Sequence, residues 1–423
     1  MVRLSRKEKY RRRRARARFL LALNLFMLAA LVLVGGLVYA AWRNGDPLFP
    51  AWRDGDPPSS AHGSGSSASP DNTGDLGPAG GGTGGGASEA HPASPSPSAV
   101  PVRETVTIAL VGDLLPAGRV AEAMRREGAD YPFRKAKPVL ESADLAVGNL
   151  ETPFTSRGVP AENKQYVFKA APEHAAALRE AGFDALSLAN NHILDQGLEG
   201  LEDTIAHLKE AGLAFMGAGQ NEKEAYAPAM LERNGITVAL IGLSRVVPEV
   251  SWKAGPRNPG VAEAYDTTRA IAAIREADEK ADVVVVYMHW GVERNDQPEP
   301  YQREMGRAFI DAGADLVVGC HPHVLQGFEP YKGRWIAYSL GNFVFTTTGL
   351  SKTQETGVLV AECEKSGACA LRFHPMFADK FQPAPMEPEA ARKLLERIES
   401  VSFGAVIGPD GTITASEDGA DSA

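Results

Sequence analysis

The alternation of apolar and amphipathic segments over residues 103–403 constrains the fold of this chain most strongly. Short apolar runs rich in β-branched residues indicate strands that are buried on both faces. Longer stretches with apolar residues at helical spacing lie between several of them, a pattern typical of an α/β fold whose sheet is covered by helices. We expect strands at residues 105–111, 144–148, 185–188, 236–241, 282–288 and 315–318, and helices at residues 173–181, 198–211, 267–280 and 301–312.

The pattern changes toward the end of this region, where strand follows strand. Apolar runs at residues 335–338 and 341–345 precede runs at residues 358–363 and 369–373, which flank a Lys-Ser-Gly turn. Consecutive strands without intervening helices favour an antiparallel arrangement. We therefore expect a second, more antiparallel sheet, and two stacked sheets flanked by helices as the architecture.

An apolar run of 23 residues near the N-terminus, 19–41, contains Asn24 as its only polar residue. This length suits a transmembrane helix. The preceding residues 1–18 hold ten basic residues and one acid, so the positive-inside rule predicts a single-pass membrane protein with a cytoplasmic N-terminus and an extracellular C-terminal domain. The alternative is a cleaved signal peptide, although the apolar region of such peptides usually spans about 7–15 residues. In both cases the body of the protein is exported.

Two further segments lack the composition of a folded core. Residues 42–102 consist mainly of Gly, Ser, Ala and Pro, which cannot bury enough apolar area to offset the entropy of ordering. We interpret them as a disordered linker, residues 103–403 as the folded domain, and the polar residues 404–423 as a flexible tail. Residues 1–18 carry a net charge of +9 and the whole chain carries −9, so residues 19–423 carry −18. Binding of nucleic acid needs a basic surface for the phosphates, so this acidic charge excludes nucleic acid as a partner.

Polar side chains follow five of the expected strands at the points where these strands end. In α/β folds ligands bind beyond the carboxyl ends of strands, so we expect one shared site. Imidazole and carboxylate groups without a nearby Cys pair suit Zn, Fe, Mn or Ni. Each group taken alone has a structural alternative, such as a helix cap, a turn or a hydrogen-bonded core histidine, and the shared position of the five makes the functional interpretation stronger. The residues are Asp113; Asn149 and Glu151; Asn190, Asn191 and His192, extended by Asp195; His289; and His321 and His323.

Six motifs carry a family resemblance: GDLLPAGR, GNLETP, LANNHILDQG, HWGVE, GCHPHV and YSLGNFVF. In this order and spacing they resemble the CapA family of capsule-synthesis proteins, which is associated with poly-γ-glutamate capsules and belongs to the calcineurin-like metallophosphoesterase superfamily. The resemblance covers residues 104–348. It implies a four-layer αββα sandwich with one or two divalent metal ions, of Mn, Fe or Zn, at its upper edge.

The resemblance also implies a role for each residue of the motifs. Metal ligands would be Asp113 and His323 for the first ion, Asn191, His289 and His321 for the second, and Glu151 as the bridging carboxylate, with Asn149 as the alternative bridge. His192 would be the acid that protonates the leaving group, helped by Asp195. Arg119 and Asn149 would bind an anionic substrate group. One departure matters: Leu115 stands where the superfamily usually has a histidine. We therefore expect either weaker binding of the first ion or a site that works with a single metal.

Two functions follow as expectations from the resemblance. The first is a membrane-anchored, extracellular, metal-dependent hydrolase or transferase in poly-γ-glutamate capsule biosynthesis. The second is a non-catalytic accessory subunit that grips anionic polymer for a membrane synthase or export complex. Expected partners are therefore the membrane, the capsule polymer or another anionic substrate, and synthase or export subunits. The Leu115 departure favours the second function slightly, and the intact histidine clusters favour the first.

The three cysteines exclude both a disulfide-dense scaffold and a Cys-based zinc ribbon. Cys363 and Cys369 flank the turn of the expected hairpin, and an exported domain lies outside the reducing cytosol, so a cross-strand disulfide is the preferred interpretation. Two free thiols are the alternative. Cys320 lies beside the histidine motif and is expected to be unpaired and buried.

Overall fold

The computed structural model describes residues 105–417, apart from residues 163, 347–348 and 350. The segments expected to be cytoplasmic, membrane-spanning and linker, residues 1–18, 19–41 and 42–102, lie outside this range. No helix within the described residues has the length and apolar character needed to cross a bilayer.

The first of two large sheets has ten strands and is built around β1 (Thr105–Leu114). A parallel part runs from β1 through β2 (Leu145–Leu150) and β3 (Ala185–Ser187) to β4 (Ala214–Met216), and the short β13 (Asn342–Val344) also pairs with β1 in parallel. On its other edge β1 pairs antiparallel with β14, which begins an antiparallel part. Its strands are β14 (Glu355–Glu364), β15 (Cys369–Asp379), β16 (Gln382–Pro385), β17 (Ala405–Ile407) and β18 (Thr412–Ala415).

The second sheet has six strands in the order β11-β12-β10-β9-β7-β6, and its four central strands are parallel. The edge strands β11 and β6 are antiparallel to their neighbours. Two very short strands, β5 (Ala218–Gly219) and β8 (Gly260–Val261), pair separately. The six strands are β6 (Ala229–Arg233), β7 (Ile236–Ser244), β9 (Val283–His289), β10 (Leu316–Cys320), β11 (Phe328–Tyr331) and β12 (Arg334–Ala337).

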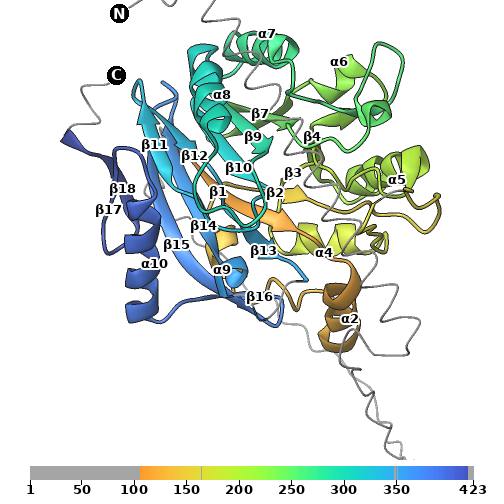
Figure 1. Cartoon of the computed structure of the whole chain (residues 1–423), viewed down its shortest axis with the longest axis horizontal. Coiled ribbons are helices and arrows are strands. Elements are labelled where there is room, and N and C mark those ends of the chain that lie inside the picture. Colours follow the sequence, from red (N-terminus) through yellow and green to blue (C-terminus); the bar gives the residue numbers. More distant parts are fainter. Residues whose placement is uncertain (1–104, 163, 347–348, 350, 418–423) are drawn as a thin grey trace, which may run out of the picture. The chain divides into compact units, whose positions relative to one another are not determined.

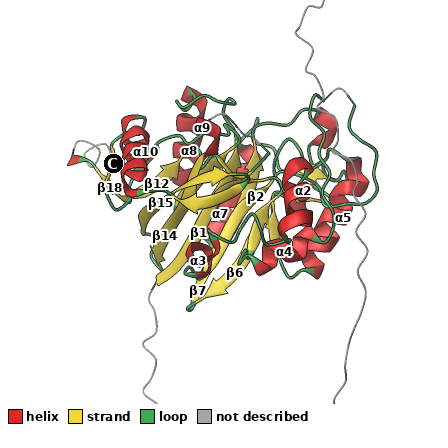
Figure 2. Cartoon of the chain, turned by 90° about the horizontal axis from the view of Figure 1, so that it is seen from below, coloured by secondary structure: helices red, strands yellow, loops and turns green. Residues whose placement is uncertain are grey.

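The two sheets stack, and helices cover their outer faces (Figures 1 and 2). Alternate side chains of β1 and β9, such as Ile108 and Val285, share one hydrophobic cluster, which places the central core between the sheets. A second cluster joins the other face of β1 to α2 (Gly118–Glu127), α3 (Lys137–Glu141), α4 (His174–Glu180) and α5 (Gly197–Glu210). A third joins the other face of β9 to α7 (Thr268–Asp278) and α8 (Pro300–Asp311). The short elements are α6 (Glu222–Ala225), η1 (Val250–Trp252) and α9 (Ser351–Gln354), and α10 (Pro388–Ser400) packs with the central core.

The α/β class predicted from the sequence is confirmed, and each predicted helix agrees with an observed one to within two residues at either end. The prediction that the late strands build the second sheet holds for residues 335–338, which overlap β12, and is wrong for the runs that follow. Residues 358–363 and 369–373 belong to β14 and β15, which extend the first sheet through β1, with Ile108 opposite Ala361. This pairing covers an edge of β1 that the parallel strands leave open.

The predicted flexible tail is also wrong in part. Residues 405–407 and 412–415 form β17 and β18, and Leu371 of β15 lies opposite Ile413. Ile407 and Ile413 are buried in the central core, where they pack with α10. A few well-spaced apolar residues in a polar segment were sufficient to add an edge to the sheet.

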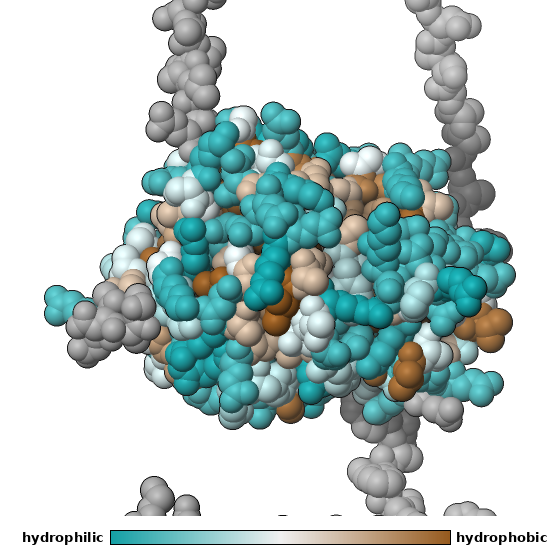
Figure 3. All heavy atoms as spheres, turned by 90° about the horizontal axis from the view of Figure 1, so that it is seen from above, coloured by the Kyte–Doolittle hydropathy of each residue, from teal (hydrophilic) through white to brown (hydrophobic). Residues whose placement is uncertain are grey.

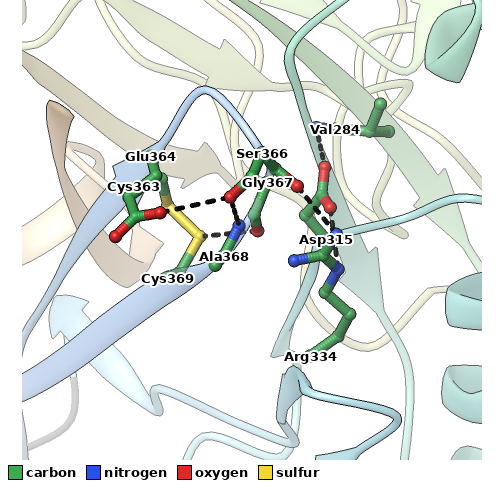
Figure 4. Close-up of a disulfide and its surroundings, with 9 residues drawn as sticks. All are labelled: Val284, Asp315, Arg334, Cys363, Glu364, Ser366, Gly367, Ala368 and Cys369. Carbon is green, nitrogen blue, oxygen red and sulfur yellow. Dashed lines mark hydrogen bonds and ion pairs between the residues drawn. A yellow bond between two sulfur atoms is a disulfide. The ribbon is translucent and has the colours of Figure 1, made fainter. Parts of the chain in front are cut away.

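Cys363 and Cys369 lie directly opposite each other in the β14–β15 hairpin and form a disulfide, with an S–S distance of 2.07 Å (Figure 4). The turn between them contacts the second sheet, because Arg334 of β12 donates to the Ser366 carbonyl and pairs with Asp315 at 3.0 Å. Gly367 has a φ of 77°, and a Cβ there would lie 2.0 Å from Asp315 Oδ1. The hairpin tip is therefore fixed at the end of both sheets opposite the site described below.

The surface fits this division into buried core and polar exterior. The face shown in Figure 3 is mostly hydrophilic, with hydrophobic residues in small, separate groups. Single exposed apolar side chains of this kind are normal on folded domains.

Candidate metal centre

The predicted site residues lie at the carboxyl ends of parallel strands from both sheets. Asp113 lies near the end of β1 and Asn149 near the end of β2, while His289 and Cys320 are the last residues of β9 and β10. Because the sheets stack with these ends side by side, loops that are far apart in sequence meet over one edge of the molecule.

Asp113 occupies a distorted stretch of β1. The register of β1 shifts between Leu110 and Asp113 against β2, and again after Asp113 against β13. Such bulges re-aim side chains and are common beside functional sites. The neighbouring Gly112 permits the close passage of β13, because a Cβ at this position would lie 1.8 Å from the Gly341 carbonyl oxygen.

A network of buried amides connects three of the loops. The Asn149 side chain donates to Asp113 Oδ1 at 2.9 Å, and Asn190 donates to Asn149 Oδ1 at 3.1 Å. Asn190 also accepts from the backbone N–H groups of His192 and Ile193. Asn149 thus uses its amide within the protein and is fully buried, which favours a positioning role over the predicted contact with substrate.

His289 is the point where donors from both sheets converge. Its Nε2 lies 2.8 Å from Asn191 Oδ1 and 3.7 Å from Glu151 Oε1. On the other side of the ring, its Nδ1 lies 3.3 Å from Cys320 Sγ and 4.0 Å from Asp113 Oδ1. Contacts on both nitrogens fix the orientation of the imidazole.

His321 and His323 both adopt left-handed backbone conformations, with φ of 94° and 57°. Non-glycine residues with such φ values are strained, and strain of this kind gathers at functional sites. The His321 backbone N–H donates to Asp113 Oδ2 at 3.2 Å, and His323 Nδ1 lies 3.2 Å from the same oxygen and 2.9 Å from Asn342 Oδ1. The Gly-Cys-His-Pro-His turn therefore wraps around the Asp113 carboxylate.

His192 and Asp195 form a pair with a third member that the sequence did not suggest. His192 Nδ1 lies 2.7 Å from Asp195 Oδ2, which also accepts from the Phe168 backbone N–H. Lys164 donates to Asp195 Oδ1, lies 3.1 Å from His192 Nδ1, and donates to the Asn191 carbonyl. The Lys164 side chain is largely buried, and its loop is thereby joined to the Asn-Asn-His loop.

The donor set fits a divalent metal. Both oxygens of the fully buried Glu151 carboxylate lack a hydrogen-bond partner among the described residues, as does Nδ1 of His321. Buried polar groups without partners are rare in folded proteins unless a ligand satisfies them. Potential ligand atoms fall into two groups whose members lie within 4.8 Å of one another: Asp113, His289 and Cys320, and Glu151, His321 and His323. Nitrogen and carboxylate donors of this kind suit Zn, Fe or Mn.

The ionisation of these groups agrees with that interpretation. Burial, followed by repulsion from Asp113, raises the pKa of Glu151 well above its usual range, and a bound cation would remove this penalty. Burial lowers the pKa of His289 strongly and that of His321 to about 3, so both are neutral near pH 7, as metal ligation requires. Burial is the largest single influence on His323 and opposes its charge, but the hydrogen bond with Asp113, together with the attraction of the Asp113 and Glu293 carboxylates and the hydrogen bond with Asn342, raises its pKa.

Two residues named from the motifs lie elsewhere. Arg119 is on α2, where its guanidinium lies 5.3 Å from the centroid of the Phe381 ring. Leu115 is fully buried in the hydrophobic cluster between the first sheet and its helices. The ten other predicted residues are brought together: Asp113, Asn149, Glu151, Asn190, Asn191, His192, Asp195, His289, His321 and His323.

Lys164, Asn342 and the thiol contact of Cys320 were missed as parts of the site. Asn342 and Cys320 lie inside motifs that the sequence singled out, so their proximity to the site could have been inferred. Lys164 lies in a loop between two motifs and follows no strand, so its position gave no signal.

Comparison with known proteins identifies the family. The family described as bacterial capsule synthesis protein PGA_cap matches residues 107–347, a range that contains every residue of the site. The chain belongs to this family. Its relatives include the capsule biosynthesis protein CapA of Bacillus anthracis, 36% identical over 67% of this chain and 70% of the relative, and the PGA biosynthesis protein CapA of Bacillus subtilis (strain 168), 33% identical over 69% and 76%. A probable polyglutamine synthesis accessory protein of Mycobacterium tuberculosis is 34% identical over 65% and 77%.

In this chain all the site residues lie between β1 and β13. The predicted site residues follow five strands, Lys164 lies in a loop and Asn342 begins β13, and the matched region contains them all. The antiparallel extension formed by β14 to β18 lies beyond the matched residues.

Proposed function

We propose that this protein is a metal-dependent hydrolase or transferase that acts on an anionic polymer in poly-γ-glutamate capsule biosynthesis. The single observation that carries the proposal is the buried Glu151 carboxylate, whose Oε1 lies 3.7 Å from His289 Nε2 and neither of whose oxygens has a hydrogen-bond partner among the described residues. The names of the two Bacillus relatives support the capsule context. The order of the motifs supports a metallophosphoesterase-like αββα sandwich.

The residues at this edge would hold one or two divalent ions. Their ligands would come from Asp113, Glu151, Asn191, His289, His321 and His323. A bound divalent ion supplies Lewis acidity and lowers the pKa of a coordinated water. Leu115 contributes no ligand because it is buried in a hydrophobic cluster, so the Asp113 position has one donor fewer than the superfamily pattern.

The protein's own proton-transfer group is His192. Its Nδ1 faces Asp195, which leaves Nε2 to exchange a proton with the reacting groups. Burial lowers the pKa of His192, although the hydrogen bond to Asp195 opposes this shift, so Nε2 carries a lone pair near neutral pH. We infer that Nε2 accepts the proton that the attacking water loses and then returns it to the leaving group.

We further propose that residues 19–41 anchor the protein in the membrane, with the folded domain outside the cell. The apolar length and the preceding basic residues support this topology. The Cys363–Cys369 disulfide supports it independently, because disulfides persist mainly in oxidising compartments.

A second candidate is a non-catalytic subunit that grips polymer for a membrane synthase or export complex. The buried Leu115 favours it, because a site with fewer ligands binds an ion less tightly and hydrolyses less efficiently. In this case the ion and its ligands would act as an anion-binding site, and His192 would have no essential role.

The deciding experiment measures metal content and turnover on the same preparation of purified protein. Metal stoichiometry is determined after loading with Mn²⁺, Fe²⁺ or Zn²⁺, and hydrolysis is followed with generic phosphodiesters and with γ-linked glutamate oligomers. The enzyme proposal expects metal-dependent turnover that His192→Ala lowers by about 10²–10⁴-fold. Metal binding with polymer affinity but without turnover would favour the accessory function.

A further inference from the structure

A second cationic position lies on the same edge of the second sheet, immediately beyond β7. Ser244, the last residue of β7, is paired with His289 of β9, and the Arg245 backbone N–H donates to the His289 carbonyl at 2.8 Å. Arg245 is thus attached directly to the strand end that carries a central histidine of the candidate metal centre.

The Arg245 side chain is held by two tyrosines. Its guanidinium carbon lies 4.0 Å from the ring centroid of Tyr265 and 5.3 Å from that of Tyr301. Both rings are themselves fixed to backbone, since Tyr265 accepts from the Val247 N–H at 3.3 Å and Tyr301 accepts from the Gly291 N–H at 2.7 Å. A guanidinium over aromatic faces is stabilised and oriented without using its hydrogen-bond donors.

Those donors are available. Within the part of the chain that the structure describes, no carboxylate forms an ion pair with Arg245, and the residue is only partly buried. The nearby carboxylate of Glu263 is already occupied, because it pairs with Lys253 at 3.5 Å and accepts from the Tyr265 backbone N–H. A preorganised guanidinium with free donors matches a planar carboxylate in a two-bond arrangement.

Other cations continue this arrangement toward the metal centre. Lys253 Nζ lies 4.5 Å from the ring centroid of Tyr265. Lys164 Nζ lies 5.0 Å from the ring centroid of Trp252, the residue that precedes Lys253. Lys164 in turn contacts the His192–Asp195 pair. Cations and aromatic rings therefore alternate between the candidate metal centre and Arg245.

We propose that Arg245 is the anchor of a subsite that binds a carboxylate of the polymer beside the metal centre. This inference rests on the proposed function, because it assumes that an anionic polymer reaches that edge. It assigns to Arg245 the role that the motifs suggested for Arg119, which lies instead over Phe381 on α2.

The test is calorimetric binding of a γ-linked glutamate oligomer to the metal-loaded full-length protein. Arg245→Gln should weaken binding roughly tenfold or more, because charge-assisted hydrogen bonds are lost. Arg245→Lys, which keeps the charge without the two-pronged donor, should fall between wild type and Arg245→Gln. The matched control is Arg275→Gln, an exposed arginine of α7, which should bind as wild type. Metal content and melting temperature are measured for every variant.

The outcomes distinguish a failure of the proposed function from a failure of the Arg245 subsite. Absence of oligomer binding by the wild-type protein would overturn the proposed function, and this inference with it. Wild-type binding that neither Arg245 variant weakens would overturn the subsite alone. A parallel titration with inorganic phosphate distinguishes the ligand: if the Arg245 variants lose phosphate binding but keep the oligomer, the carboxylate assignment is wrong.

Discussion

At the scale of single residues, Glu151 explains why this edge of the molecule requires a partner. A fully buried carboxylate without a hydrogen-bond donor destabilises the fold, because the low local polarity disfavours its charged form. A divalent cation beside Glu151 would stabilise the charged form. His289 and His321 are also suited to bind a cation, since burial keeps both neutral and leaves lone pairs on their nitrogens.

The first prediction concerns the stability of the metal-free protein. The pKa of Glu151 is raised in the folded state, so its contribution to stability is present below the unfolded pKa, about 4.5, and is lost as pH rises through the folded pKa. Glu151→Gln should remove this pH-dependent loss and stabilise the metal-free protein near pH 7, while the stabilisation by added Mn²⁺ or Zn²⁺ should shrink. Thermal unfolding with and without metal at several pH values measures both effects. A variant that is less stable without metal and equally stabilised by it would contradict the prediction.

The second prediction separates ligands from the proton-transfer residue. His289→Ala and His321→Ala should each lower the metal content, because each removes a nitrogen donor. His192→Ala should keep near-wild-type metal content, because His192 is paired with Asp195. Elemental analysis of the purified variants decides. If the His289 and His321 variants retain a full metal complement, the hypothesis that these residues share one metal site is wrong.

At the scale of elements, α8 is attached to the second sheet by a buried carboxylate. Glu329 of β11 accepts hydrogen bonds from Arg303 and Arg307, one turn apart on α8, and from the Tyr338 hydroxyl. Burial alone would raise the pKa of Glu329, but these donors outweigh it and lower the pKa. This cluster positions the helix that carries Tyr301 and so supports the loop after His289.

The third prediction follows from that cluster. Because the folded pKa of Glu329 is lowered, its stabilisation is present above the unfolded pKa of about 4.5 and is lost as pH falls through the folded value. Glu329→Gln should lower the free energy of unfolding at pH 7 by about 1–3 kcal/mol, a modest effect because solvent screens the two partly exposed arginines. The difference in free energy of unfolding between variant and wild type, measured with denaturant, should become smaller below pH 4.5. A stability difference that does not change with pH would show that the ion pairs of Glu329 are not its cause.

The fourth prediction concerns the hairpin and the three cysteines. Cys363 and Cys369 are bonded in β14–β15, and Cys320 is fully buried and free. Without reduction, thiol labelling should modify no cysteine in the folded protein and only Cys320 after denaturation. Labelling of three cysteines in the unreduced, denatured protein would refute the disulfide.

At the scale of the whole molecule, the site exists because two sheets stack with their carboxyl ends on one edge. Asp113, Asn149 and Asn191 come from the first sheet, and His289, His321 and His323 from the second. The disulfide-closed hairpin tip, which contacts Asp315 at the start of β10, lies at the other end.

The fifth prediction tests the proposed topology. External protease added to intact cells should remove the folded domain and leave an N-terminal fragment in the membrane, because the positive-inside rule predicts a cytoplasmic position for the basic residues 1–18. Immunoblotting with antibodies against each end follows both products. Full protection of the domain in intact cells, with cleavage after lysis, would contradict it.

The sequence by itself determined the α/β class, the central strands and helices, and the residues at the strand ends. These features depend on local periodicity and on the rule that parallel strands present their carboxyl ends together, so they can be inferred without coordinates. The ten predicted strand-end residues meet for that reason. The pairing of Cys363 with Cys369 was equally local, since a tight turn places the two cysteines opposite each other.

Tertiary structure decided what depends on contacts between distant segments. Pairing of β14 with β1 placed the late strands in the first sheet. Burial of Ile407 and Ile413 in the central core stabilises the pairing of residues 405–415 at the edge of that sheet. The positions of Lys164 beside Asp195 and of Arg245 over two tyrosines follow from loop packing, for which the sequence carries no periodic signal. Leu115 lies in a hydrophobic cluster because the helices of the first sheet pack there. Long-range packing, and not local preference, therefore selected which side chains complete the site.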